Sequence, residues 1–260
     1  MGILNYTPNS FFDGGKFNNI NNALKQIEIM LTNGADIIDI GAISSKPGSG
    51  ILSLKEEKER LFPLFTEISK NFSDIIFSLD TFRAEIAKQF VNDFGVSIIN
   101  DISAGELDSE MFKTIAALKV PYIIMHMQGT PENMQNNPRY NKAIDLEIIE
   151  FFAKKIAELK LLGVNDIIID PGFGFGKTLE HNYQLLNKLE SFNIINLPLL
   201  VGVSRKSMIN KLLDISPNEA LNGTTVINTI ALQKGANILR VHDVKEASEA
   251  IKLIKMMKNS

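Results

Sequence analysis

Several polar residues end, or directly follow, short apolar segments of this sequence, and their types could carry acid, base and anion-binding chemistry. They are Asn5, Asp80, Asn100, His126, Asp170, Ser204 and His242. A helix cap explains Ser, Asp or Asn at such a position, and for Asp80 alone it remains an alternative. Capping gives no reason for His, so together these residues indicate a shared site.

Arg205 and Arg240 lie at the ends of the last two apolar segments, beside Ser204 and His242. A planar guanidinium and an imidazole could bind an anion such as phosphate. Residues 204–207 also precede a predicted helix, whose N-terminus favours negative groups. The alternative for both arginines is an ordinary ion pair at the surface.

The segment DPGFGFGKT, at 170–178, resembles a phosphate-binding loop because Gly-Lys-Thr ends a glycine-rich turn. A Walker A loop needs Gly at the position of Pro171, which has no amide hydrogen, so we reject a P-loop. His181 follows at the start of a predicted helix, where it caps or packs. No ligand cluster typical of a tight metal site occurs, although Mg²⁺ carried by phosphates would leave no sequence signature.

Short apolar segments must position these residues, and each is followed by a segment of helical period, such as 21–34 with Ala23, Ile27, Met30 and Leu31 on one stripe before Gly34. The apolar segments are 2–4, 36–40, 75–79, 96–100, 122–126, 166–170, 199–203 and 237–241. None alternates apolar and polar residues, so the strands should be buried on both faces. Eight strand–helix units predict an α/β fold, the (β/α)8 TIM barrel, with an open doubly wound sheet as the alternative.

The length of 260 residues, 45% of them hydrophobic, predicts a single domain over 1–260. A net charge of −3 and a pI of about 5.7 exclude a nucleic-acid-binding surface. The absence of cysteine excludes disulfides and sulfur-based zinc sites, and it fits a reducing cytoplasm. Neither a signal peptide nor a membrane span is expected. Longer connections at 6–19 and 41–53 leave the carboxyl ends of strands, where barrel active sites lie.

Segments along nearly the whole chain resemble the dihydropteroate synthases, in order and with one segment for each predicted strand. They are GILNYTPNSFFDGG, ADIIDIGAISSKPGS, FSLDT, IINDIS, MHMQGTPENMQ, IIIDPGFGFGKT, LLVGVSRKSM and ILRVHDV. The resemblance implies a transferase of folate biosynthesis that joins 6-hydroxymethyl-7,8-dihydropterin diphosphate to 4-aminobenzoate. Pyrophosphate would leave first, and the arylamine would attack the resulting pterin cation to give 7,8-dihydropteroate. The resemblance also implies Mg²⁺, a cytoplasmic homodimer, and sulfonamides as inhibitors.

The same resemblance implies a role for each site residue. The pterin pocket would comprise Asp80, Asn100, Ile102, Met125, Asp170, Phe175 and Lys206. Asp170 and Asn100 would pair with the amino-pyrimidine edge, and Lys206 with the pterin carbonyl and ring nitrogen. The diphosphate would be held by Asn5, Arg240 and His242, with Asn5 also near Mg²⁺, and 4-aminobenzoate by Ser45, Pro47 and Ser207. The catalytic set would be Asp80, Lys206, Arg240 and His242, because the reaction needs a carboxylate near developing positive charge and an anion clamp.

Two loops depart from the family pattern. Residues 42–48 read AISSKPG where the family has GESTRPG, and Asn9 stands where Asp is usual. Because Ile43 and Lys46 replace the usual acid and arginine, we expect weaker binding of 4-aminobenzoate and sulfonamides, with pterin affinity preserved. The first strand begins almost at Met1, so a further alternative is that the chain is cut from a longer parent, including one fused to another folate enzyme.

Two other functions remain as alternatives. A methyltransferase that binds reduced folate shares the barrel and the acidic pterin contacts, but we would not expect it to carry both SRKS and RVH. A non-catalytic paralogue that only binds pterin is favoured slightly by the altered second loop.

Overall fold

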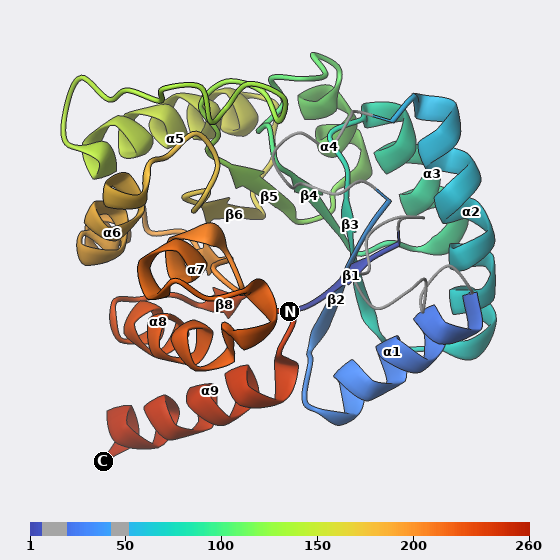
Figure 1. Ribbon diagram of the computed structural model, residues 1–260. Coiled ribbons are helices and arrows are strands. Elements are labelled where there is room, and N and C mark those ends of the chain that lie inside the picture. The colour runs from blue at the N-terminus through green and yellow to red at the C-terminus, as the bar shows by residue number, and fades with distance from the viewer. Residues whose placement is uncertain (7–19, 43–51) are drawn as a thin grey trace.

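The computed structural model describes residues 1–6, 20–42 and 52–260, and within them strands and helices alternate around a central barrel (Figure 1). The strands are β1 Gly2–Asn5, β2 Ile37–Gly41, β3 Ile76–Asp80, β4 Ile98–Asp101, β5 Tyr122–Met125, β6 Ile167–Asp170, β7 Leu200–Val201 and β8 Ile238–Leu239. The TIM barrel expected from the sequence is therefore confirmed. Every predicted strand is present, but β7 and β8 are two residues long where five were predicted.

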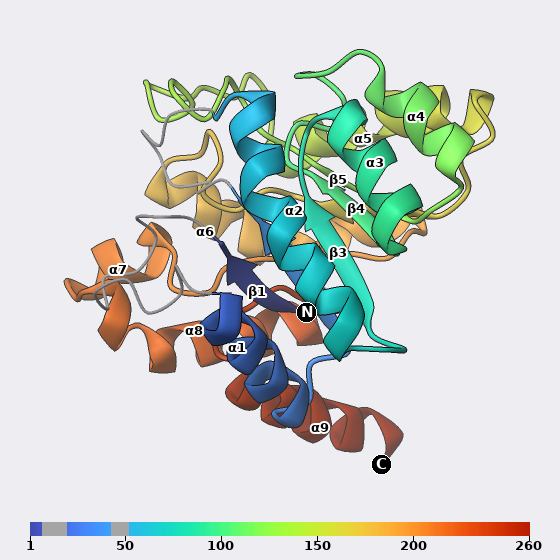
Figure 2. The same cartoon turned by 90° about the vertical axis from the view of Figure 1, so that its right-hand side faces the viewer.

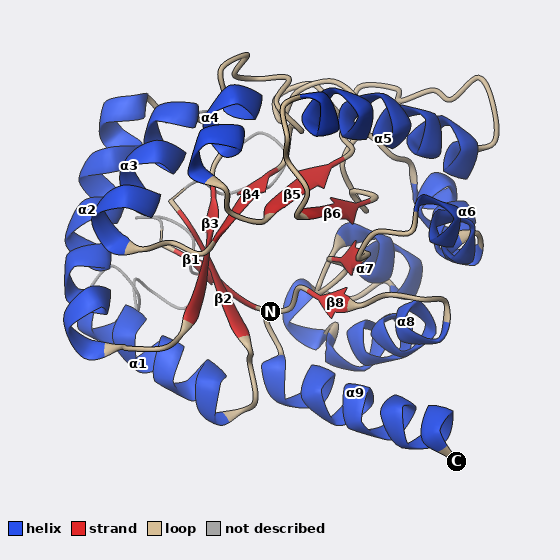
Figure 3. Cartoon of the chain, turned by 180° about the vertical axis from the view of Figure 1, so that it is seen from behind, coloured by secondary structure: helices blue, strands red, loops and turns tan. Residues whose placement is uncertain are grey.

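The strands are parallel and follow one another in sequence order around the barrel (Figure 3). β1 to β6 form one continuous sheet, and β7 pairs with β8. Single bridges from Ile169 to Leu199 and from Gly2 to Val241 join the two sheets and close the circle. Because all strands run the same way, their carboxyl ends meet at one end of the barrel.

Helices cover the outside of the strands, and α1, α2 and α3 follow one another along one side (Figure 2). The helices are α1 Ile20–Thr32, α2 Leu54–Asn71, α3 Ala84–Phe94, α4 Met111–Leu118, α5 Ile144–Leu161, α6 Leu179–Asn187, α7 Ser207–Leu213, α8 Leu221–Gln233 and α9 Val244–Asn259, with short 3-10 turns at Leu189–Ile195 and Pro217–Glu219. Both α7 and α8 lie between β7 and β8, so this unit carries one helix more than the sequence pattern predicted. None of the helices in the described ranges is long and apolar enough to cross a membrane.

The predicted stripe of α1 faces the core. Ala23, Ile27 and Met30 are buried and Leu31 is half-buried, and the helix ends before Gly34, whose φ of 96° few other residues adopt. Inside the barrel a separate cluster takes one buried residue from each of four neighbouring strands. Its members are Ile98, Ile123, Ile168 and Leu200. Burial of each such side chain contributes about 2 kcal/mol, so the barrel interior is a packed core that holds the strand ends in place.

Candidate active site

The carboxyl ends of β1, β3 and β4 carry polar residues, and the end of β2 carries Gly41 in register with them. In register, Asn5 is the partner of Gly41, Gly41 of Asp80, and Asp80 of Asn100. Gly41 leaves room for its neighbour, because a Cβ there would lie 3.1 Å from the Cβ of Asp80. The predicted convergence of Asn5, Asp80 and Asn100 on one end of the barrel therefore follows from the strand register.

Asp39, in the middle of β2, is the centre of a buried polar network that the sequence analysis did not predict. One carboxylate oxygen accepts from Ser78 Oγ at 2.6 Å, and the other from Asn100 Nδ2 at 3.1 Å and Arg240 Nε at 2.6 Å. Asp39 is 1% exposed, so these donors replace the water that a carboxylate would otherwise need. The available signal was an acidic residue inside the apolar segment DIIDI.

Arg240 lies between two carboxylates. Besides Asp39, it donates from Nη2 to Asp80 Oδ2 at 2.7 Å. Burial alone would lower the pKa of Arg240, but Asp39 and Asp80 outweigh it and raise the pKa, so the side chain stays a cation. Among the described residues Nη1 of Arg240 has no hydrogen-bond acceptor.

The pKa of Asp80 is higher than is usual for an aspartate. Burial raises its pKa from 3.8 to about 7, Arg240 opposes the rise, and the nearby charge of Asp39 adds to it. A carboxyl group that titrates near neutral pH is typical of functional sites, because its protonation state can respond to a neighbouring charge.

Three of the predicted pterin residues form one apolar wall. Ile102, Met125 and Phe175 are buried together in a cluster separate from the main core. Its other buried members are Phe82, Met127 and Met134. The wall lies at the strand ends, since Met125 is the register partner of Asp170.

Charged groups edge this wall. Lys206 Nζ lies 4.6 Å from the centre of the Phe175 ring and donates to the Phe173 carbonyl at 2.5 Å. Burial lowers the pKa of Lys206 to about 8, against the opposing charge of Asp170. Asp170 is 5% exposed, and burial raises its pKa although its Oδ1 accepts the Gly172 N–H at 2.8 Å. An apolar wall with a carboxylate and an ammonium at its edges can bind a flat aromatic ring that carries polar edges.

The remaining predicted residues lie around the mouth of the barrel or outside the described ranges. Ser207 is the exposed first residue of α7, and Asn5 is half-buried at the end of β1. His242 donates its backbone N–H to Ser204 Oγ at 3.2 Å, which ties the residues after β8 to those after β7. The predicted 4-aminobenzoate residues Ser45 and Pro47 lie outside the described residues, as do the substitutions at Asn9, Ile43 and Lys46.

Arg205 does not join Arg240. Its Nε and Nη2 donate to the two carboxylate oxygens of Asp243 at 3.0 and 2.6 Å, and this pairing raises the pKa of Arg205. The ion-pair alternative therefore holds for Arg205, whereas Arg240 is buried.

The glycine-rich loop after β6 packs on the chain after β5 instead of cradling phosphate. Gly172 and Gly176 have φ angles of 71° and 63°, and a Cβ at these positions would lie 1.9 Å from the His126 carbonyl oxygen and 2.5 Å from that of Gln128. Only glycine fits such an approach. The rejection of a P-loop agrees with this packing, and Lys177, which would have marked the motif, is buried beneath the loop.

His181 has the capping role expected for it. Its backbone N–H donates to Thr178 Oγ1 at 3.1 Å, and its Nδ1 accepts the Thr178 N–H at 3.2 Å, which closes the first turn of α6. The ring also packs edge-on against Tyr140, with centroids 4.9 Å apart.

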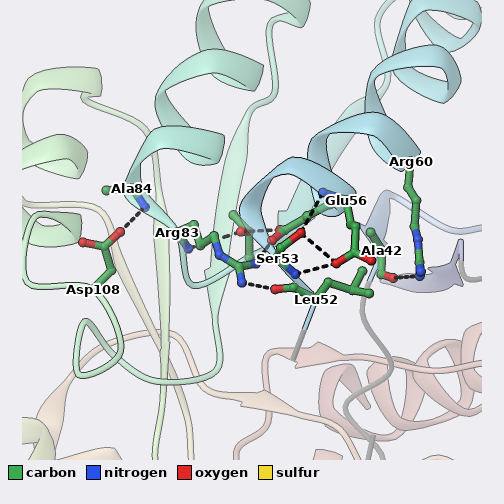
Figure 4. Close-up of polar contacts among 10 residues, drawn as sticks. Ala42, Leu52, Ser53, Glu56, Arg60, Arg83, Ala84 and Asp108 are labelled. Carbon is green, nitrogen blue, oxygen red and sulfur yellow. Dashed lines mark hydrogen bonds and ion pairs between the residues drawn. The ribbon is translucent and has the colours of Figure 1, made fainter. Parts of the chain in front are cut away.

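A second buried ion pair supports the chain beside Asp80. Glu57, fully buried in the first turn of α2, accepts from Thr81 Oγ1 at 2.7 Å and from the guanidinium of Arg83. Arg83 also donates to the Leu52 carbonyl, as Figure 4 shows. In the same view Arg60 reaches the Ala42 carbonyl at 3.4 Å. These contacts hold the backbone at Ala42 and Leu52 against α2 and the end of β3.

Comparison with known proteins shows which family this chain resembles. It matches the family described as pterin binding enzyme over residues 1–242. It is 42% identical to the dihydropteroate synthase of Escherichia coli strain K12 over 256 residues, which are 98% of this chain and 89% of that protein.

Solved structures agree with the sequence match. A dihydropteroate synthase of Yersinia pestis in complex with a sulfonamide drug has a TM-score of 0.94 and 41% identity, and the match covers 100% of this chain and 94% of that one. The Xanthomonas albilineans enzyme with 4-aminobenzoic acid has a TM-score of 0.90 and 31% identity, over 100% of this chain and 93% of that one.

Proposed function

This chain belongs to the dihydropteroate synthases, a group of pterin-binding enzymes, and from that premise we propose how its side chains perform the reaction. The observation that carries the proposal is the apolar wall of Ile102, Met125 and Phe175, which Asp170 and Lys206 edge with opposite charges. A pterin ring fits this arrangement, because it has two flat apolar faces and an edge rich in hydrogen-bond donors and acceptors.

In the pterin subsite, Asp170 accepts hydrogen bonds from the amino-pyrimidine edge, where a carboxylate matches two donors. Asn100, which the Asp39 contact orients, pairs with the same edge. Lys206 donates to the pterin carbonyl and ring nitrogen. These roles leave the methylene carbon of the substrate near the strand ends that carry Asp80 and Arg240.

In the diphosphate subsite, Arg240 and His242 bind the leaving group, with Nη1 of Arg240 as the donor that no described residue occupies. Among the described residues no group of three acidic or histidine side chains could hold a metal by itself. Mg²⁺ bound through phosphate oxygens needs few protein ligands, and we assign the amide oxygen of Asn5 as one. When bound, the ion offsets the negative charge of the departing pyrophosphate.

In the reaction, the bond between the pterin methylene carbon and the diphosphate oxygen breaks, and pyrophosphate leaves with the electron pair. The cation that forms is delocalised over the pterin, and the Asp80 carboxylate stabilises it from a water-poor site. The amine of 4-aminobenzoate then attacks the methylene carbon and loses one proton. Ser207, with Ser45 and Pro47, receives this second substrate, and sulfonamides compete for the same subsite.

We also propose a homodimer that works in the cytoplasm. Each of the last three helices of the chain exposes large apolar residues that a second copy would cover. They are Leu212, Leu213, Leu221, Val226, Ile251, Leu253, Met256 and Met257. The absence of cysteine is compatible with a reducing compartment.

The test separates the synthase from its two alternatives. Purified protein is offered pterin diphosphate with 4-aminobenzoate and Mg²⁺, and in parallel methyltetrahydrofolate, while calorimetry measures binding of each pterin. Dihydropteroate formation supports the proposal. Binding of methyltetrahydrofolate without binding of pterin diphosphate would indicate a methyltransferase, and pterin diphosphate binding without product would indicate a non-catalytic paralogue.

A further inference from the structure

A buried lysine, Lys177, lies beside Phe175 of the apolar wall in the loop after β6. Lys177 is 3% exposed, and its Nζ lies 2.9 Å from the Gly172 carbonyl oxygen, 3.0 Å from that of Phe175 and 3.4 Å from that of His126. The fourth neighbour is Nδ1 of the His126 ring, at 3.0 Å. Three carbonyl oxygens and one imidazole nitrogen therefore surround the amine.

The charge states of this group follow from its surroundings. His126 is buried, and burial together with Lys177 lowers its pKa to about 2, so the ring is neutral and can present a lone pair at Nδ1. Burial lowers the pKa of Lys177 well below its usual value, and the charge of Lys206 adds to that shift, whereas the charge of Asp170 opposes it. The three carbonyl oxygens favour the ammonium form, because it has three protons to donate and they can only accept. Nδ1 of His126 accepts as well in the tautomer that carries the ring proton on Nε2.

The cage joins two separate segments of the chain. His126 directly follows β5, and Gly172 and Phe175 belong to the loop after β6. The carbonyl groups of the two segments converge on Lys177, so without a cation they would repel one another. The Gly172 oxygen would keep the Phe175 N–H as a donor, whereas the Phe175 and His126 oxygens would lose the donor that Lys177 supplies. The cation thus holds the loop against the end of β5, in addition to the glycine packing described above.

The same loop presents pterin-facing groups on its other side. Phe175 is part of the apolar wall, and the Phe173 carbonyl holds Lys206 at 2.5 Å. Asp170 begins the loop and is tied to it by the Gly172 N–H. The positions of Asp170, Phe175 and Lys206 therefore depend on the backbone that Lys177 supports.

We propose that Lys177 is a positioning residue for the pterin subsite, with the neutral His126 ring as its partner: a tethered internal cation that fixes the loop after β6. This inference rests on the proposed function for its kinetic readout. It assigns the lysine of the Gly-Lys-Thr sequence a structural charge in place of a contact with phosphate.

Two substitutions at this position test the proposal because they treat the cage differently. Lys177→Met fills the space without charge, whereas Lys177→Ala leaves a cavity with the shape of n-propylammonium. We expect both variants to raise the KM for pterin diphosphate about tenfold, as when one tenth of the protein is binding-competent, with kcat changed by less than about threefold. Added n-propylammonium should restore the KM of Lys177→Ala but not that of Lys177→Met.

Matched controls exclude effects of salt and of charge alone. Tetramethylammonium, which cannot donate a hydrogen bond, should restore neither variant. Lys142→Met removes an exposed lysine that pairs with Glu150, and its KM should equal that of the unmodified protein. Should Lys177→Met fail to fold, His126→Leu removes one acceptor from the cage and should raise the same KM.

An unchanged KM in the folded Lys177 variants, or a raised KM that n-propylammonium leaves raised in Lys177→Ala, would overturn the positioning role. Calorimetric binding of pterin diphosphate gives a second readout that needs no turnover. If the unmodified protein makes no dihydropteroate, the proposed function fails. The role of Lys177 is then decided by whether n-propylammonium restores pterin binding in Lys177→Ala.

Discussion

Arg240 donates from Nε to Oδ2 of Asp39 across 2.6 Å, although 201 residues separate the two in the sequence. The contact joins the residue after β8 to the middle of β2, across the seam where the barrel closes. The same pair also contacts two further residues of the proposed site, since Asp39 accepts from Asn100 and Arg240 donates to Asp80. One buried ion pair therefore belongs both to the seam of the barrel and to the proposed site.

The substitution Asp39→Asn should disturb both the seam of the barrel and the geometry of the site. The amide cannot balance the charge of Arg240, and breaking a buried pair costs about 3 to 5 kcal/mol of unfolding free energy when the remaining charge has no other partner. Because Asp80 still pairs with Arg240, we expect a loss below that range but above the cost of one neutral hydrogen bond. Urea denaturation measures the loss. Ser78→Ala, which removes only the hydroxyl donor at 2.6 Å, serves as the control and should cost about 1 kcal/mol. Equal stability of the two variants would show that the charge of Asp39 is not needed.

Replacing Arg240→Lys should retain the positive charge but lose activity. The guanidinium donates from Nε to Asp39 and from Nη2 to Asp80, and in the proposed site Nη1 donates to the diphosphate. A lysine ammonium cannot reproduce this planar arrangement of three nitrogens. Loss of such a preorganised contact lowers the rate on the order of 10²-fold. The measurement is kcat at saturating substrates, with Arg205→Lys as the matched variant, since Arg205 is paired with Asp243. Turnover of Arg240→Lys at the level of the unmodified protein would make Arg240 a purely structural residue.

Replacing Asp170→Asn should weaken pterin binding. In the proposed pocket the carboxylate accepts two hydrogen bonds from the amino-pyrimidine edge, whereas an amide presents one donor to a donor, which costs about 1 to 3 kcal/mol for the unpaired group. Calorimetry with pterin diphosphate should therefore show a dissociation constant raised about 10- to 100-fold. An unchanged constant would remove Asp170 from the pocket.

The raised pKa of Asp80, about 7, predicts an acid limb in the pH profile. The proposed mechanism needs the Asp80 carboxylate, which exists above that pKa, so kcat/KM for pterin diphosphate should fall as the pH drops through about 7. Folding also binds a proton here between pH 3.8 and about 7, so the contribution of Asp80 to stability is lost as the pH rises through that range. The diphosphate of the substrate also titrates, but an acid limb of the kcat/KM profile that comes from the substrate would persist in Asp80→Asn. A limb near pH 7 that survives this substitution would not belong to Asp80.

Much of the site could be predicted because a barrel brings the carboxyl ends of its strands together. A polar residue that ends an apolar segment is visible in one sequence, and Asn5, Asp80, Asn100 and Asp170 were found in this way. The alignment of Asn5, Asp80 and Asn100 then follows from the strand register, and Asp170 ends β6 at the same end of the barrel. The family pattern supplied the roles of these residues.

Other features depend on contacts that no local pattern records. Asp39 lies within a strand, and its meaning depends on a donor that is 201 residues away. The partners of Lys177 include backbone carbonyls, which every residue type possesses. The short lengths of β7 and β8 reflect pairing with neighbouring strands, and Arg205 was ambiguous until its position beside Asp243 was known.

The most direct test of the account is the stoichiometry of the reaction. With saturating pterin diphosphate, 4-aminobenzoate and Mg²⁺, the folded protein should release one pyrophosphate for each 7,8-dihydropteroate formed, and chelation of Mg²⁺ should slow both products equally. Folded protein that binds both substrates yet yields neither product would contradict the assignment of this site to dihydropteroate synthesis.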